Sequence, residues 1–396
     1  MAAAVYIGDL REKYLAGGPG TYTRPNTGRD GTWTKQGGGD APGGGGNPPN
    51  NSGIELVLLE NANSRDFAIE AILGATQWAN VINSSNSTGV LSQISKKVYE
   101  IFEDKFDFIF FVLNNPRDET IINALGFKAR NISVSNDVKG LGIKEYSNAS
   151  AYGSAGKLKS IMYFPFHDAI KEGPSLHEIA HNWGVHICPT YYPDNSSSGG
   201  HWGVSNAGGQ LGGFKYVRAV STSGGATEYQ ASIYPPSQDG SFKNVLFGVG
   251  GYANNFIPYS DIELYLMGMI GADVLRANNF KLDVYTGLSY DPERFGDGYF
   301  KATGITQYTI DDLINRNGNG PRVPDASVSQ KTFKVLTVIM SKSGDTSAST
   351  RYDKIVEDVK WFAGDGNTSD WLYTFKRATG GRGSLEVNGI INSLKP

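Results

Sequence analysis

Residues 177–186 read His-Glu-Ile-Ala-His-Asn-Trp-Gly-Val-His, and they contain an H-E-x-x-H motif. Residues four apart lie on the same face of a helix, about 5–6 Å apart at Cβ, so His177 and His181 can bind one metal ion. A catalytic zinc site takes imidazole nitrogens at about 2.0–2.1 Å and keeps three protein ligands and one water. The spacing therefore predicts a zinc site built on a helix.

The flanking residues favour the same helix. An apolar stripe at the spacing i, i+3, i+4, i+7 is formed by Leu176, Ile179, Ala180 and Trp183. This pattern is typical of an amphipathic helix whose apolar face packs against the core. Gly184 is expected to end the helix. The two histidines then lie at the edge of the buried face, which makes a chance match to this short motif the weaker interpretation.

Glu178 indicates what the metal would do. A carboxylate next to the ligands can take a proton from a metal-bound water, whose pKa zinc lowers to about 7. A purely structural zinc site fills its fourth position with protein and needs no such carboxylate. Glu178 therefore favours a catalytic site, and the alternative is an ordinary solvated helix residue.

The motif leaves the third ligand open among several residues. His201 ranks first, because flexible glycines before it can fold a loop over the metal. His186 ranks second, because it stands one residue before the last histidine of the metzincin pattern H-E-x-x-H-x-x-G-x-x-H. An acidic residue, Glu263 or Asp261, ranks third, as in sites with two histidines and a glutamate. His167 precedes the helix and is not expected to be a ligand.

Further segments extend the pattern along the chain. The earlier ones are His-Glu-Ile-Ala-His-Asn-Trp-Gly (177–184), Gly-His-Trp-Gly (200–203), Leu-Gly-Gly (211–213) and Tyr-Ser-Asp-Ile-Glu-Leu-Tyr-Leu-Met-Gly-Met (259–269). The later ones are Thr-Ile-Asp-Asp-Leu-Ile (309–314), Gly-Pro-Arg-Val-Pro (320–324) and Ala-Thr-Gly-Gly-Arg-Gly-Ser-Leu (378–385). Over roughly residues 54 to 390 the chain resembles a group of bacterial, largely uncharacterised zinc metallopeptidases of the zincin class.

This resemblance implies an α+β fold of the zincin-like metallopeptidase type, with a mixed sheet, an active-site helix and a loop-rich C-terminal subdomain. It also supports His201 as third ligand. Leu-Tyr-Leu-Met-Gly resembles a Met-turn, in which Met267 forms an apolar floor under the metal; plain core packing is the alternative. Tyr259 or Tyr265, near this turn, is a candidate for stabilising the oxyanion.

The chain divides into three parts. Residues 1–16 form a docking or disordered segment, and residues 17–53 form a Gly/Pro-rich linker that cannot fold alone. The catalytic domain spans 54–396, with an N-terminal subdomain (54–186) and a C-terminal subdomain (187–396).

Periodicity predicts the elements of this domain. Strands are expected over 54–59, 106–113, 127–135, 157–164 and 333–340. Helices are expected over 67–82, 93–103, 260–268 and 353–362, with a further helix that starts at a capping box of Thr309 and Asp312. In a zincin layout the edge strand aligns an extended substrate.

Composition excludes several classes of protein. The net charge of −3 over 396 residues offers no basic surface for nucleic acid. No apolar run is long enough for a transmembrane segment, and the N-terminus lacks the features of a Sec signal peptide. The single cysteine, Cys188, excludes an intrachain disulfide; it is interpreted as a small buried side chain. Residues 315–320 resemble a Ca²⁺ loop without its full ligand spacing, so an ordinary turn is expected there.

These observations predict a zinc-dependent endopeptidase that acts on a protein or peptide through Glu178, with one Zn²⁺ held by His177, His181 and His201. The alternative is a non-catalytic, zinc-stabilised structural or adhesive module of a larger particle. A leading segment on a flexible linker further suggests an extracellular or delivered effector, which residues 1–16 would dock to a secretion or injection apparatus.

Overall fold

A computed structural model describes most of the chain from residue 53 onward. The described residues are 53–59, 61, 63–184, 187, 189–190, 200–242, 245–246, 248, 250–252 and 254–396, with the backbone of the short strands β1 (Val5–Tyr6), β2 (Tyr22–Thr23) and β3 (Thr34–Lys35). The predictions about His186 and Cys188, and most of those about residues 1–53, lie outside the described residues.

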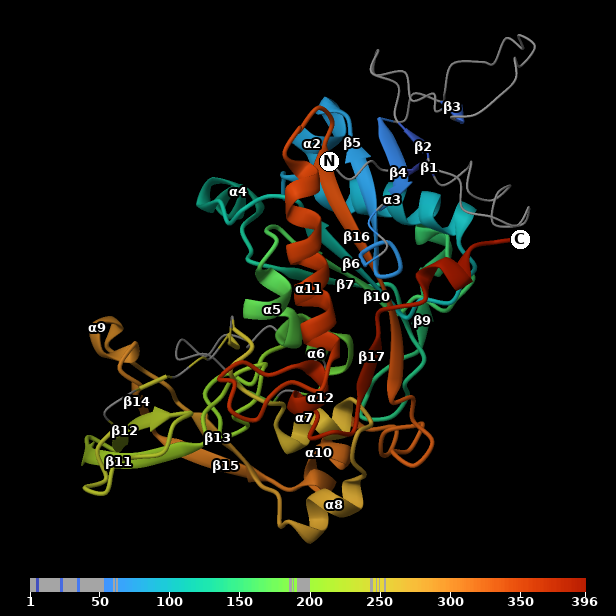
Figure 1. Ribbon diagram of the computed structural model, residues 1–396. Coiled ribbons are helices and arrows are strands. Elements are labelled where there is room, and N and C mark those ends of the chain that lie inside the picture. Colours follow the sequence, from blue (N-terminus) through green and yellow to red (C-terminus); the bar gives the residue numbers. More distant parts are fainter. Residues whose placement is uncertain are drawn as a thin grey trace.

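The largest sheet is mixed and has eight strands, and it lies in the upper part of the view in Figure 1. Its order is β1-β4-β5-β16-β6-β10-β7, with β17 beside β16. The strands are β4 (Ile54–Leu58), β5 (Ala68–Leu73), β16 (Thr332–Lys342), β6 (Phe108–Leu113), β10 (Ser160–Phe164), β7 (Arg130–Ser133) and β17 (Ser384–Glu386). The four strands β5, β16, β6 and β10 run parallel, whereas β4 and β7 pair antiparallel on the two sides.

Helices cover both faces of this sheet. All six residues of β6 are buried, and they alternate between two cores: Phe108 packs in one and Ile109 in the other. The first core is closed by α5 (Ala169–Glu172), α6 (Ser175–Gly184) and α11 (Tyr352–Ala363), and the second by α2 (Ala75–Val81) and α3 (Ser87–Ile101). Burial on both faces explains why the parallel strands are apolar throughout.

The structure corrects one predicted element. The helix expected over 67–82 is instead strand β5 followed by the short helix α2. The segment Ala-Ile-Glu-Ala-Ile-Leu lies between β4 and β16, and burial on both sides removes the alternation that would mark it as a strand. The other strands and helices expected from periodicity are present, with ends shifted by a few residues.

The central strand β16 comes from the C-terminal half of the chain and lies between β5 and β6 from the N-terminal half. The sheet therefore contains strands from both of the subdomains expected from the sequence.

The other helices are α4 (Glu119–Leu125), α7 (Asp261–Leu266), α8 (Ala272–Ala277), α9 (Pro292–Phe295), α10 (Ile310–Asn317) and α12 (Phe375–Ala378). The smaller sheets are β8 (Ser135–Asn136) with β9 (Tyr146–Ser147), β13 (Leu282–Thr286) with β15 (Gly304–Tyr308), and β11 (Tyr216–Ser223), β12 (Ala226–Ser232) and β14 (Tyr299–Ala302) in one sheet.

One expectation about an individual element is confirmed in detail. The cap of α10 forms as predicted, because Thr309 accepts from the backbone N–H of Asp312 and the carboxylate of Asp312 accepts from that of Thr309. Within the part of the chain that the structure describes, no helix has the length and apolar character needed to cross a membrane. The fold is thus a mixed α+β arrangement with α6 packed directly on its central sheet.

Candidate metal centre

Three histidines converge beside α6, two of them on the helix and one on a loop. His177 and His181 are one helical turn apart on α6, and His201 reaches them from the loop that precedes β11. The Nε2 atom of His177 lies 2.9 Å from Nε2 of His181 and 3.3 Å from Nε2 of His201. Ligands at about 2.0–2.1 Å from a tetrahedral ion are separated by about 3.3 Å, so the three nitrogens are close enough to bind one metal ion.

The tautomer of His177 is set by the main chain. Its Nδ1 lies 2.9 Å from the carbonyl oxygen of Gln210, and a carbonyl can only accept a hydrogen bond. The proton therefore sits on Nδ1, which leaves the Nε2 lone pair directed at the other two rings. Metal-ligating histidines commonly make this type of hydrogen bond, which orients the ring and increases its basicity toward the metal.

Burial keeps the helical histidines neutral. Desolvation lowers the pKa of His177 to about 4, with a further contribution from His201. Desolvation likewise lowers the pKa of His181 to about 2, with contributions from His177 and His201. Neutral imidazole is the form that binds a metal, so both side chains are in the ligand form at neutral pH.

Glu178 is buried at the junction of α6 and the edge strand β7. Its Oε2 accepts a hydrogen bond of 2.6 Å from the backbone N–H of Asn131, and the Asn131 side chain donates to the carbonyl oxygen of Glu178. Burial raises the pKa of Glu178 to about 7, against the opposing effects of the Asn131 N–H and of Arg130. A carboxyl group with this pKa is suited to exchange protons near neutral pH.

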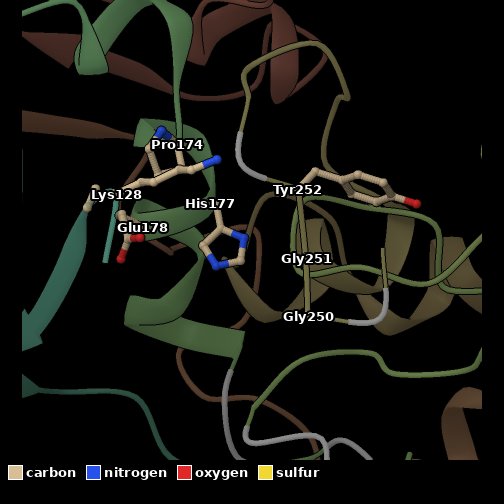
Figure 2. Close-up of a pocket in the computed structure, with 8 residues that line it drawn as sticks. Lys128, Pro174, His177, Glu178, Gly250, Gly251 and Tyr252 are labelled. Carbon is tan, nitrogen blue, oxygen red and sulfur yellow. The ribbon is translucent and has the colours of Figure 1, made fainter. Parts of the chain in front are cut away.

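His177 and Glu178 line one cleft of about 220 Å³ (Figure 2). The other lining residues are Lys128, Ala129, Pro174, Gly250, Gly251 and Tyr252. The cleft therefore lies between the start of β7, the start of α6 and the loop before α7. A potential metal ligand and a buried carboxyl group are exposed to the same space.

Glu263, which the sequence offered as a third metal ligand, binds main-chain N–H groups instead. It is 1% exposed on α7 and is not one of the clustered ligands. Its carboxylate accepts from the backbone N–H groups of Gln210 (3.0 Å), Leu211 (2.7 Å) and Ser260 (2.9 Å) and from the indole of Trp202 (3.2 Å). Glu263 thus holds the loop that carries both His201 and the Gln210 carbonyl.

Two glycines on different loops allow the backbone to approach His177 and Glu263 closely. Gly251 has φ +86°, and a Cβ atom there would lie 2.2 Å from Cε1 of His177. A Cβ atom on Gly209 would lie 2.0 Å from Oε2 of Glu263. Only glycine permits such backbone approach to a side chain.

The remaining sequence candidates lie outside the cleft. The hydroxyl of Tyr259 donates to the Leu176 carbonyl (2.8 Å), and that of Tyr265 accepts from the Arg322 N–H (3.1 Å). Met267 is buried in the core that also contains the apolar face of α6. Asp261 is exposed at the start of α7, and Nε2 of His167 lies 3.0 Å from a carboxylate oxygen of Asp168.

Some residues around the histidines carried no signal in the sequence. Asn131 lies in β7 and Lys128 directly before this strand, and Gln210 acts through its main-chain carbonyl, which any residue type possesses. Comparison with protein-family models, with curated proteins and with solved structures found no match for this chain.

Proposed function

We propose that the protein is a zinc-dependent endopeptidase. The observation that carries this proposal is the presence in one cleft of His177, from a cluster of three histidines, and the buried carboxyl group of Glu178. A site that only stabilises the fold would have no use for an ionisable carboxyl group in the same open space.

The donor set fits zinc. Three neutral imidazoles, one of them oriented by a backbone carbonyl, match the ligands of catalytic zinc sites. His177, His181 and His201 would hold the ion, which when bound lowers the pKa of a water molecule and polarises a carbonyl group.

Glu178 is the proposed proton carrier. Its Oε2 is occupied by the Asn131 N–H, so Oε1 is the atom that takes a proton from water and later delivers it to the leaving amine. Because the pKa of Glu178 is about 7, neither transfer is strongly uphill at neutral pH.

Strand β7 is the proposed docking element for an extended peptide. Among the described strands it pairs with β10 alone, and Lys128 and Ala129, which directly precede it, line the cleft. The Asn131 N–H already donates to Glu178, so a peptide added at this edge would pair with the other main-chain groups of the segment and run past the metal ligands.

The proposal is tested by metal analysis and cleavage assays on purified protein. Wild type and Glu178→Gln are each expected to contain one zinc, and only wild type is expected to cleave casein or a peptide library. Lys144→Glu, at an exposed position, serves as the control for a charge change elsewhere. Wild type without zinc, or equal cleavage by Glu178→Gln, would contradict the proposal.

The second candidate is a non-catalytic, zinc-stabilised module. It is favoured by the way the histidines join α6 to a loop that Glu263 already anchors, since a metal there would clamp the two together. The same experiment separates the candidates: bound zinc, strong stabilisation by zinc and no cleavage of any peptide would support the module.

A further inference from the structure

We infer that the cleft selects peptides with a carboxylate next to the bond to be cleaved, and that Lys128 recognises this carboxylate. The inference rests on the proposed peptidase function and adds its substrate class. Its structural basis is the charge of the cleft and the position of one lysine in it.

Lys128 is the only lysine or arginine among the eight residues that line the cleft. It lies in the short segment between α4 and β7, at the entrance to the proposed peptide-binding edge. Figure 2 shows its side chain extended along the wall of the cleft toward α6 and His177. Its ammonium group is therefore presented to whatever occupies the space beside the histidines.

This ammonium group has no ionic partner among the described residues. The ion pairs found in that part of the chain do not include Lys128. The carboxylate of Glu178, the only acidic lining residue, is instead hydrogen-bonded to the Asn131 N–H. Lys128 is thus available to a charged group of a ligand.

The balance of charge also favours an anion. With zinc bound, the cleft would contain two positive charges from the metal and one from Lys128, against one negative charge on Glu178. Complementary charge across a binding site increases affinity and suppresses ligands of the wrong sign.

The matching chemistry is a carboxylate, which has two sources in a peptide. One is the side chain of Asp or Glu beside the scissile bond, and the other is a free C-terminus. Lysine binds either as a flexible point charge. The two sources are therefore separated by experiment.

The test measures binding to zinc-loaded protein with peptide hydroxamates, whose chelating group anchors them at the metal. One probe carries Glu beside the hydroxamate, a second carries Gln, and both end in an amide. A third carries Gln and ends in a free carboxylate. Calorimetry compares the three probes on wild type, Lys128→Met and Lys128→Glu, with Lys144→Glu as matched control.

Wild type is expected to bind the Glu probe about five-fold more tightly than the Gln probe, as for a partly exposed ion pair. Lys128→Met should abolish this difference, Lys128→Glu should reverse it, and Lys144→Glu should leave it unchanged. Raising the salt concentration should reduce it. If only the third probe gains affinity over the Gln amide, the carboxylate recognised is a C-terminus.

Equal binding of all three probes by wild type, failure of every probe to bind, or a preference that survives Lys128→Met would overturn the inference. Different results would refute the proposed peptidase function and the role of Lys128. Charge-dependent binding without cleavage of any peptide would refute the peptidase while leaving the carboxylate site intact. Cleavage with the same sequence preference in wild type and Lys128→Met would refute the role of Lys128 alone.

Discussion

The carbonyl oxygen of Gln210 lies 2.9 Å from Nδ1 of His177, although the two residues are 33 positions apart. This contact sets the tautomer of the central histidine, and Glu263 holds the Gln210 main chain in place through its N–H group. The geometry of the histidine cluster therefore depends on α7 as well as on α6.

Replacing Glu263 with Ala should weaken metal binding without touching a ligand. Four buried N–H donors would lose their acceptor, which should cost about 3 kcal/mol of stability. Zinc affinity should fall at least about ten-fold, in the range known for loss of a group that orients a ligand. Urea unfolding and zinc titration measure the two effects. Asp261→Ala, at an exposed position of the same helix, should change both only slightly.

Gly251→Ala should disturb His177 directly. The new methyl group would lie 2.2 Å from Cε1 of the ring, at a backbone φ of +86° that alanine disfavours. Gly224→Ala is the matched control, because Gly224 also has positive φ (+62°) but no atom lies within 4 Å of its Cβ position. Only the first variant should lose zinc affinity, while both should lose about 1 kcal/mol or more of stability. Normal zinc binding by Gly251→Ala would contradict the described packing.

The pH dependence of stability should reveal the buried Glu178. Its pKa is raised from 4.5 to about 7 in the folded protein, so the folded state favours the protonated form. The stabilising contribution is complete below pH 4.5 and is lost as pH rises through about 7, by about 3 kcal/mol in total. The lowered pKa values of His177 and His181 make stability rise with pH, which opposes the effect of Glu178. The contribution of Glu178 must therefore be measured as a difference between wild type and a variant that lacks its carboxyl group.

The appropriate comparison is wild type against Glu178→Gln, both free of metal, by urea unfolding at pH 5 and pH 8. Relative to the variant, wild type should be less stable at pH 8 than at pH 5. A difference that is independent of pH would show that Glu178 titrates as an exposed carboxyl group does.

Removal of the metal should loosen the loop that carries His201. A ligand that binds only the folded state at about a hundred times its Kd stabilises by about 2.7 kcal/mol. A chelator should therefore lower the melting temperature of wild type and increase hydrogen exchange between residues 200 and 213. His201→Ala should melt at a lower temperature and respond little to chelator, whereas His167→Ala, outside the cluster, should respond as wild type does.

The role of residues 1–16 is tested by deletion. If this segment docks the protein to a secretion or injection apparatus, its removal should abolish export while zinc content stays at one ion per chain. Export that continues unchanged without residues 1–16 would exclude that role.

The sequence by itself determined the features that depend on neighbours along the chain. The spacing of His177 and His181 predicted a helix with both rings on one face, and α6 has this form, because helical geometry relates residues four apart whatever the rest of the fold does. The apolar run of β6 and the cap of α10 were predictable for the same reason. His201 was favoured through the glycines beside it, and it lies with the other two histidines.

The tertiary structure decided which distant segments meet. Strand β16 pairs with β5 and β6, although more than 200 residues separate it from either strand. Pairing with β16 accounts for the strand conformation of β5, a segment for which the sequence predicted a helix. Glu263, considered as a ligand, instead anchors the loop of Gln210, and the Asn131 N–H occupies an oxygen of Glu178. The donors in these contacts are main-chain N–H groups, which every residue type except proline carries, so only the arrangement of the chain in space could place them.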